Sequence, residues 1–546
     1  MNGFLLDFLD TVLYNNSFWS EYDVVFYTLI ACSILFAIYV NYEELGKILR
    51  DNKEPLIIVL LLLTVLIGGF FRFSNMLFEY NSHDSTWEYI NGARYFSETG
   101  KIFKCYGPSF YQCFGKTPVS HPGLLSFILG LFYSLLGYNL NATMILSVIV
   151  STLTIPLAYY SVKTFLDSEK LGLMAAISLS IFPLHALYSG NLDFVLSVFS
   201  IFSIFFVILT TGLVIKKDTK ESWILLMASY LFMVSFRWEH PIVIFFSLVL
   251  ILSSQERPLD YVKEKISKKW FWFYGIIFSF LSIAPLKGIY SVWFRQESLG
   301  KSFTTAFFFE SFSKAYSLLT RLYNLPGLLF ILLIPFALKE DKKKSSIILV
   351  WWLTYIILYA FFRNGLTDRY VMNSLPPLIL IGCIGLKNIF TNNNIIDKFS
   401  KERLLVIFSI LMFLTIFISL PGQRPLISYD TYKRDDIGGF HDISEEIDKP
   451  LVVPNINTLL SLLTESEKTV YSFLTLTFFE EIDDLGEVYF IRTDGCEHEP
   501  GKEICEYMVG QGEKTDIKLN EWDVYLISMS SEEIEYMNER VTEDDF

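Results

Sequence analysis

The sequence predicts a mainly α protein, namely a polytopic helical membrane protein of about twelve spans followed by a C-terminal soluble α/β domain. Of its 546 residues, 52% are hydrophobic and only 19% are charged, and the mean hydropathy is +0.41. A soluble protein of this length carries more charge. Apolar runs of about twenty residues, the length that crosses a bilayer, also recur along the chain. Composition and pattern therefore agree on a membrane protein.

The charge of residues 421–546 sets them apart as a separate domain. They contain 10 Lys and Arg against 30 Asp and Glu, a formal charge of −20, whereas the rest of the chain carries +6. We expect an N-terminal outer segment with an extra transmembrane helix (1–54), a transmembrane domain (55–420) whose first outer loop covers 75–140, and this acidic domain. The balance argues against nucleic acid as a partner, because nucleic-acid-binding surfaces are basic.

Basic residues determine the predicted orientation. Residues 1–23 contain no Lys or Arg, whereas three basic residues at 47–53 follow the first apolar run, Val24–Tyr39. Cytoplasmic segments are enriched in Lys and Arg, so the N-terminus is expected outside. The next run, Pro55–Phe73, then returns outward. We therefore predict a multi-pass plasma-membrane protein whose loop 75–121 and acidic domain are extracytoplasmic.

The apolar run Pro122–Gly137 is short and carries small residues, Ser126, Gly130 and Ser134, at a spacing suited to close helix contact. If this run spanned the membrane, the basic turn 163–170 would face outward, against the enrichment of basic residues on the cytoplasmic side. We therefore expect a helix that lies in the outer interface, with an ordinary span as the alternative.

The later predicted passes are Asn141–Val162, Leu171–Leu187, Phe194–Ile215, Trp223–Phe236, Pro241–Leu252, Phe271–Ile289, Tyr323–Leu338, Ile347–Phe362, Val371–Leu386 and Leu404–Leu420.

In the acidic domain, short apolar runs alternate with polar segments, a pattern typical of a small α/β fold. The predicted strands are Leu451–Val453, Thr469–Leu474, Val488–Ile491 and Val524–Ile527. The domain contains no metal, phosphate or nucleophile motif, which predicts a structural or acceptor-facing role.

Four of the 6 cysteines form two local pairs in segments that are predicted to be external. Cys105 and Cys113 lie in the first outer loop, and Cys496 and Cys505 lie in the acidic domain. Disulfides persist in oxidising compartments, so both pairs are disulfide candidates, with four free thiols as the alternative.

Charged and aromatic residues gather on the predicted outer face, above all in the long loop that starts at Tyr80. Within it, Asp84 and Glu88 share one face if the following segment is helical. Any one such residue at a span end can be an interfacial side chain, yet carboxylates, cations and aromatics together suit a lipid phosphate and a sugar. The other charged residues of this face are His121, His185, Asp193, Arg237, Glu239, His240, Arg295, Lys301, Arg363, Asp368 and Arg369.

The order of these elements resembles the GT-C glycosyltransferases, in particular the protein O-mannosyltransferase and lipid A aminoarabinose transferase group. The resemblance covers roughly residues 55–420, while the acidic domain lacks the Trp-Trp-Asp-Tyr-Gly signature of the oligosaccharyltransferase branch. The matching features are Asp84 with Tyr89, Ala93 and Gly100; His121–Gly137; the basic turn Lys163–Gly172; Phe182-Pro183 before Asp193; Arg237–Pro241; and Arg369-Tyr370 with Pro376-Pro377.

This resemblance implies transfer of a sugar from a polyprenyl-phosphate-linked donor to a lipid, glycan or protein acceptor at the outer membrane face, within membrane lipid. It implies that Asp84 is the general base or a metal ligand and that His121 approaches the donor phosphate. A Mg or Mn ion bridging Asp84 and Asp193 is a further possibility that the carboxylates allow. We expect the substrate-binding residues to be Glu88, His121, Asp193, Arg237, His240 and Arg369.

Two other classes of function remain open. A secondary transporter would have an internal repeat and ionisable groups near mid-membrane, and neither is evident in the sequence. A non-catalytic membrane scaffold that presents the acidic domain is the other alternative.

Overall fold

The computed structural model of the chain describes part of its 546 residues, and all structural statements below refer to this part. The described residues are 22–50, 54–74, 84–106, 115–118, 122–138, 140–190, 195–290, 324–360, 371–391, 410, 449, 451–453, 470–472, 486–492, 496, 501–519 and 522–530.

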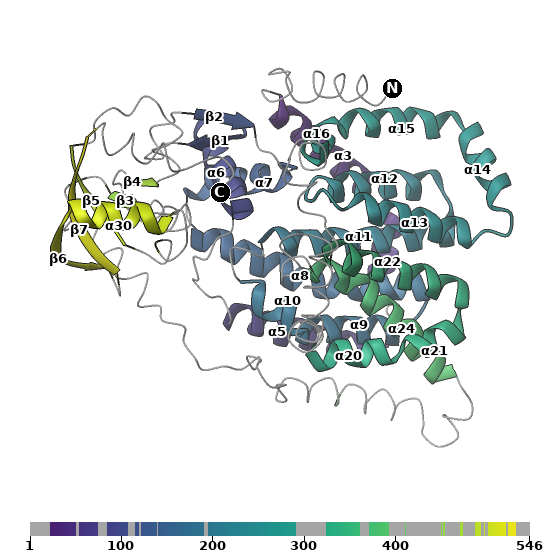
Figure 1. Ribbon diagram of the computed structural model, residues 1–546. Helices are drawn as coiled ribbons and strands as arrows, with labels where there is room; N and C mark the ends of the chain where they lie inside the picture. Colours follow the sequence, from purple (N-terminus) through teal and green to yellow (C-terminus); the bar gives the residue numbers. More distant parts are fainter. Residues whose placement is uncertain are drawn as a thin grey trace. The chain divides into compact units, whose positions relative to one another are not determined.

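The chain divides into two compact units (Figure 1). The first comprises residues 1–76, 120–125 and 141–429, and its described elements are all helical. They are α3 (Asp23–Val40), α4 (Tyr42–Arg50), α5 (Pro55–Ser74), α8 (Leu140–Leu166), α9 (Glu169–Ile181), α10 (Pro183–Tyr188), α11 (Val195–Lys217), α12 (Lys220–Val234), α13 (Pro241–Ser253), α14 (Pro258–Ser267), α15 (Lys269–Leu281), α16 (Ile283–Tyr290), α20 (Asn324–Leu332), α21 (Ile334–Glu340), α22 (Lys342–Ala360), the 3₁₀ helix η5 (Met372–Ser374) and α24 (Leu375–Thr391).

Among the described residues, five stretches are long and apolar enough to cross a membrane: α3, α5, most of α8, α11, and η5 with α24. The pair α13 and α14, which meet at a bend of 111°, makes a sixth. This number is lower than the twelve predicted passes because several of those passes are shorter helices, such as α9 with 13 residues and α12 with 15. The predicted pass Leu404–Leu420 lies outside the described residues apart from Ile410.

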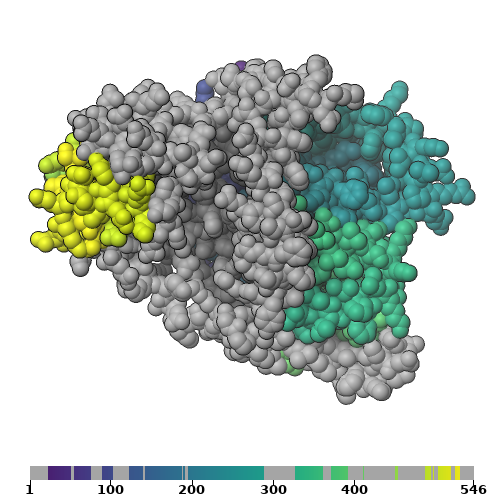
Figure 2. All heavy atoms as spheres, viewed as in Figure 1, coloured from purple at the N-terminus to yellow at the C-terminus, as the bar shows by residue number. Residues whose placement is uncertain are grey.

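Hydroxyl groups link the buried helices of the first unit. Ser161 on α8 donates to the carbonyl of Phe205 on α11 at 2.7 Å, and Thr210 on α11 lies 2.9 Å from Ser229 on α12. Such bonds and small residues hold helices together where lipid removes the hydrophobic driving force. On α24, a Cβ on Gly385 would lie 2.4 Å from the carbonyl oxygen of Leu333, so only glycine allows this contact with the α20–α21 break. Atoms of the later teal helices and of the green helices meet on one face in Figure 2.

The second unit contains residues 77–119, 126–140 and 430–546. Its N-terminal part includes α6 (Asp84–Thr99), the antiparallel strands β1 (Phe103–Tyr106) and β2 (Gly115–Pro118), and most of α7 (Leu124–Leu136). The helix α7 corresponds to the short helix expected at Pro122–Gly137. A Cβ on its Gly130 would lie 2.8 Å from the carbonyl oxygen of Ala93, so the small-residue stripe brings α7 against α6.

The acidic domain is built on a five-stranded sheet of order β4-β3-β5-β7-β6. Its strands β3 (Leu451–Val453), β4 (Val470–Ser472) and β5 (Gly486–Ile491) are parallel, whereas β7 (Trp522–Met529) runs antiparallel to β5. The strand β6 (Glu513–Leu519) forms one edge and was not among the predicted strands. The helix α30 (Gly501–Gln511) contributes Ile504 and Met508 to the core of the domain.

Candidate functional site

Charged residues are concentrated in the turn between α12 and α13. The helix α12 ends at Val234, and Pro241 occupies the first turn of α13, where its missing N–H leaves no intrahelical bond unmade. The turn between them carries Arg237, Glu239 and His240, which are 4%, 0% and 0% exposed. Three ionisable side chains are thus buried at one end of the helical unit, and burial of charge requires partners.

Glu239 is the centre of this group. Its Oε1 accepts hydrogen bonds from the Arg237 Nε–H, from the Tyr359 hydroxyl and from the Asn373 side-chain amide, the last at 3.0 Å. Within the described residues its Oε2 has no hydrogen-bond partner. Burial alone would raise the pKa of Glu239, but the charge of Arg237 lowers it below its ordinary value on balance. The carboxylate is therefore ionised and balances the charge of Arg237.

His240 extends the network through a serine. Its Nδ1–H donates to the Met233 carbonyl, and its Nε2 lies 2.7 Å from the Ser200 hydroxyl, which in turn lies 2.6 Å from Asn373 Oδ1. Burial lowers the pKa of His240 to about 4, although Glu239 acts in the opposite direction. The ring is thus neutral at pH 7. We call Arg237, Glu239, His240, Ser200, Tyr359 and Asn373 the Glu239 cluster.

A second polar group surrounds Arg72, at the end of α5. The side chain is fully buried, and each of its five N–H groups has an acceptor. The acceptors are Ser151 Oγ at 2.6 Å, the carbonyls of Gly68, Ser180 and Leu179 at 2.8, 3.2 and 2.9 Å, and His185 Nδ1 at 2.6 Å. We call Arg72, Ser151 and His185 the Arg72 cluster.

Both clusters lie at the same end of the helical unit. The Arg72 cluster joins the end of α5 to the end of α9, and the chain then passes through α10 to the start of α11, which carries Ser200. The opposite helix ends carry ion pairs that are more exposed to solvent: Lys216 with Asp167 at 2.5 Å, Lys265 with Asp218 at 2.7 Å, and Lys387 with Glu340 at 3.6 Å. One end of the unit is thus rich in lysine pairs, and the other carries the two buried clusters.

The structure brings together two of the predicted substrate-binding residues, Arg237 and His240. Asp84 and Glu88 belong to the first turns of α6, and their side chains lie outside the described part. His121, Asp193 and Arg369 also lie outside it. No group of three or more His, Cys, Asp or Glu side chains in the described part is placed to hold a metal ion. The predicted Asp84–Asp193 metal pair is not among the side chains described.

The buried Arg, Glu and His side chains of the two clusters that were not among the predicted site residues are Glu239, Arg72 and His185. Glu239 stands between Arg237 and His240 in the sequence, and this position was the available signal. Arg72 falls inside an apolar run, where it resembles an interfacial anchor, and only the fold shows that it points inward.

Of the two predicted cysteine pairs, Cys496 and Cys505 form a disulfide with their Cα atoms 5.6 Å apart. The backbone of Cys105 lies in β1, while its side chain and Cys113 are outside the described part.

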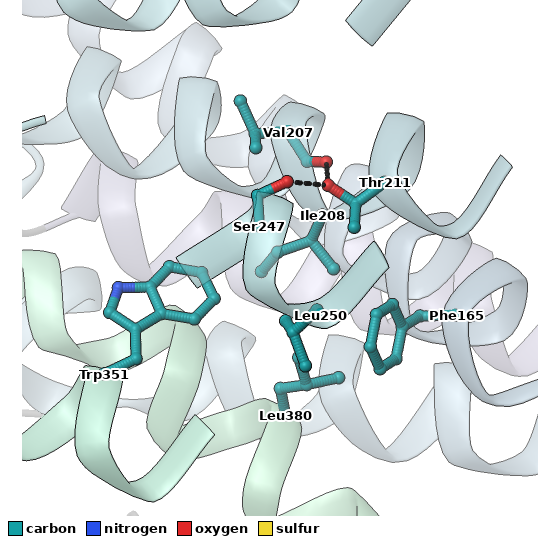
Figure 3. Close-up of a pocket in the computed structure, with 8 residues that line it drawn as sticks. All are labelled: Phe165, Val207, Ile208, Thr211, Ser247, Leu250, Trp351 and Leu380. Atoms are coloured by element: carbon teal, nitrogen blue, oxygen red, sulfur yellow. Dashed lines mark hydrogen bonds between the residues drawn. The ribbon is translucent and has the colours of Figure 1, made fainter. Parts of the chain in front are cut away.

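A cavity between α8, α11, α13, α22 and α24 offers no chemistry of its own (Figure 3). The lining side chains that carry polar atoms are Trp351, Thr211 and Ser247, and the hydroxyls of Thr211 and Ser247 lie 2.6 Å apart and point toward one another. Both hydroxyls are satisfied and no ionisable group lines the cavity, so we do not consider it a reaction site.

Three comparisons relate the chain to known proteins. The family described as dolichyl-phosphate-mannose-protein mannosyltransferase matches residues 120–288, which is well under half of the chain. No curated protein sequence matches significantly. Among solved structures, ArnT from Cupriavidus metallidurans bound to undecaprenyl phosphate aligns with a TM-score of 0.54 at 9% identity, over 86% of this chain and 97% of its own.

The apo form of the same ArnT aligns with a TM-score of 0.54 at 10% identity and the same coverage. The apo oligosaccharyltransferase of Archaeoglobus fulgidus aligns with a TM-score of 0.50 at 10% identity, over 83% of this chain and 71% of its own. At such identities the likeness concerns the fold.

Proposed function

Because the chain has the fold of the GT-C membrane glycosyltransferases and is close to the ArnT and protein mannosyltransferase group, we propose that it transfers a sugar from a polyprenyl-phosphate-linked donor to an acceptor. The observation that carries this proposal is the alignment with 97% of a transferase that has been crystallised with undecaprenyl phosphate. The acceptor is a lipid, a glycan or a protein.

In the proposed reaction an acceptor hydroxyl attacks the sugar carbon from the side opposite the phosphate, with inversion. Asp84 accepts the hydroxyl proton as general base, the bond between the sugar carbon and the phosphate oxygen breaks, and the lipid phosphate leaves. His121, Arg237 and Arg369 stabilise the departing phosphate by charge and hydrogen bonding. Glu239 fixes Arg237 through its Nε, which holds the guanidinium in one orientation. Glu88, Asp193 and His240 complete the proposed substrate site.

We propose the extracytoplasmic face of the plasma membrane for this reaction. The helix ends opposite the two clusters carry lysines such as Lys163, Lys216 and Lys217, and cytoplasmic segments are enriched in Lys and Arg. The cluster end is then external.

A Mg²⁺ or Mn²⁺ ion is a further part of the proposal. Carboxylate oxygens suit such hard cations, and Asp84 and Asp193 would hold the ion and let it neutralise phosphate charge. Treatment of the purified protein with EDTA should then lower transfer, and added Mg²⁺ or Mn²⁺ should restore it. An unchanged rate of sugar transfer in EDTA would show that the reaction does not require the ion.

The test uses the full chain in lipid nanodiscs with a panel of radiolabelled undecaprenyl-phosphate sugars and membrane extract as the source of acceptor. We expect incorporation of label into the acceptor and release of undecaprenyl phosphate. Asp84→Asn should lower the rate at least about 100-fold, because a positioned base contributes about that much or more. Glu98→Gln, on the same helix α6 and partly exposed, should leave the rate unchanged. Transfer by Asp84→Asn at the parent rate would exclude Asp84 as the base.

A further inference from the structure

The Arg72 cluster determines the tautomer of His185. A guanidinium can only donate hydrogen bonds, so His185 Nδ1, which lies 2.6 Å from Arg72 Nη2, accepts one and carries no proton. The ring proton is therefore on Nε2. This N–H is buried and has no hydrogen-bond partner in the described part of the chain. A buried donor without an acceptor is destabilising, so its retention requires an explanation.

A second buried donor lies beside the first. Ser189, which follows α10 with helical backbone angles, is four residues after His185, and residues at this spacing share one face of a helix. It is fully buried, and its Oγ has no hydrogen-bond partner among the described atoms. Its carbonyl accepts from Ser147 at 2.6 Å, which fixes the backbone at this point. Within the described part of the chain, two neighbouring donors, an N–H and an O–H, therefore lack acceptors.

The charge at this place is positive. Arg72 has no carboxylate partner in the described part, and all of its acceptors are neutral. In the Glu239 cluster, by contrast, the charge of Arg237 is balanced by a carboxylate. Among the described residues, the Arg72 cluster is therefore the one of the two buried clusters that contains no anion, and the two donors without acceptors lie next to it.

We propose that His185 Nε2–H and Ser189 Oγ–H bind the phosphate oxygens of the lipid-linked donor. Arg72 is a positioning residue, since its own N–H groups are all engaged: it fixes the tautomer of His185 and supplies positive charge behind it. This proposal rests on the proposed function and adds to it two phosphate ligands at the polar end of the helical unit. An oxyanion satisfies both donors and balances Arg72.

The experiment measures binding of a short-chain polyprenyl phosphate to the purified full chain, with the corresponding polyprenol as the uncharged control ligand. His185→Asn keeps an acceptor near the position of Nδ1 and removes the Nε2–H, and Ser189→Ala removes the hydroxyl. Ser178→Ala is the matched control, because Ser178 is equally buried but bonds only to its own helix, at 2.6 Å to the Met174 carbonyl. Thermal unfolding of each variant verifies folding.

We expect phosphate affinity to fall about tenfold or more in His185→Asn and several-fold in Ser189→Ala, as loss of a hydrogen bond to a charged group implies. Polyprenol binding should not change, and Ser178→Ala should match the parent. Arg72→Lys should weaken phosphate binding in a manner that is not additive with His185→Asn, because the two residues act as a unit. If Arg72 had only a structural role, Arg72→Lys would change the thermal stability and leave the affinity for polyprenyl phosphate unchanged.

The two proposals fail in different ways. A parent protein that binds polyprenyl phosphate while His185→Asn and Ser189→Ala bind it equally well would overturn this inference and leave the proposed function intact. An equal loss of polyprenol binding in the variants would also overturn it. A parent protein that neither binds polyprenyl phosphate nor transfers the sugar would overturn both.

Discussion

Glu239 is the residue on which the buried turn depends. Substitution Glu239→Gln would remove the carboxylate that pairs with the buried Arg237, and removal of one partner from a buried ion pair is destabilising by about 3 to 5 kcal/mol. Tyr359→Phe removes a neutral hydrogen-bond donor to the same oxygen and should be destabilising by about 1 to 2 kcal/mol. Unfolding of the purified protein in detergent measures both. If Glu239→Gln proved as stable as the parent, Arg237 would have another counter-ion.

His240 makes stability depend on pH. Its pKa is about 4 in the folded protein, against 6.5 in an unfolded chain, so between these values the unfolded state binds more protons. Stability should therefore be independent of this group above pH 6.5 and fall by about 1.4 kcal/mol per pH unit as the pH drops from 6.5 toward 4. In His240→Gln the melting temperature should fall less over this interval. Parallel curves for parent and variant would contradict the assignment.

Individual residues of the buried clusters could be predicted from the sequence, but the contacts between them could not. Arg237 and His240 could be named as candidate site residues because they stand in a short polar turn between two apolar runs. The role of Glu239 could not be predicted, because it depends on Tyr359 and Asn373, more than one hundred residues away in the sequence. Likewise, Arg72 becomes a buried cation only through α8 and α9.

The helix α3 forms polar contacts with two other segments of the first unit. The Tyr27 hydroxyl accepts from the Gly123 N–H at 2.6 Å, and one turn earlier Asp23 forms a buried ion pair with Lys287 on α16 at 3.3 Å. Gly123 lies two residues after the predicted phosphate ligand His121. The extra N-terminal helix is thus connected to a segment of the proposed site.

We expect Lys287→Met to be destabilising by about 3 kcal/mol, because it removes the cation that pairs with the buried Asp23. The double variant Asp23→Asn with Lys287→Met should recover part of this loss, since both charges are then absent. Thermal unfolding of the parent, the two single variants and the double variant measures the coupling. Additive losses would show that the two side chains do not interact.

Element type was predicted better than element length. Apolar runs such as Pro55–Phe73 became helices close to their predicted limits, and the predicted strand Leu451–Val453 is β3. The strand β6 was missed because its sequence EKTDIKL is charged, as befits an edge strand that must avoid pairing with other chains. Passes such as Leu171–Leu187 proved shorter because Pro183 starts a new helix, α10.

For the whole molecule, orientation determines whether the proposed chemistry can use an external acceptor. The lysine-rich helix ends include Lys342 at the start of α22, whereas Lys101 follows α6 in the loop predicted to be external, and both side chains are exposed. Single substitutions Lys342→Cys and Lys101→Cys should therefore differ in reaction with a membrane-impermeant maleimide. In intact cells we expect labelling of Lys101→Cys above the parent background, and labelling of Lys342→Cys only after permeabilisation. The reverse pattern would place the two buried clusters at the cytoplasmic face, where an external acceptor could not reach them.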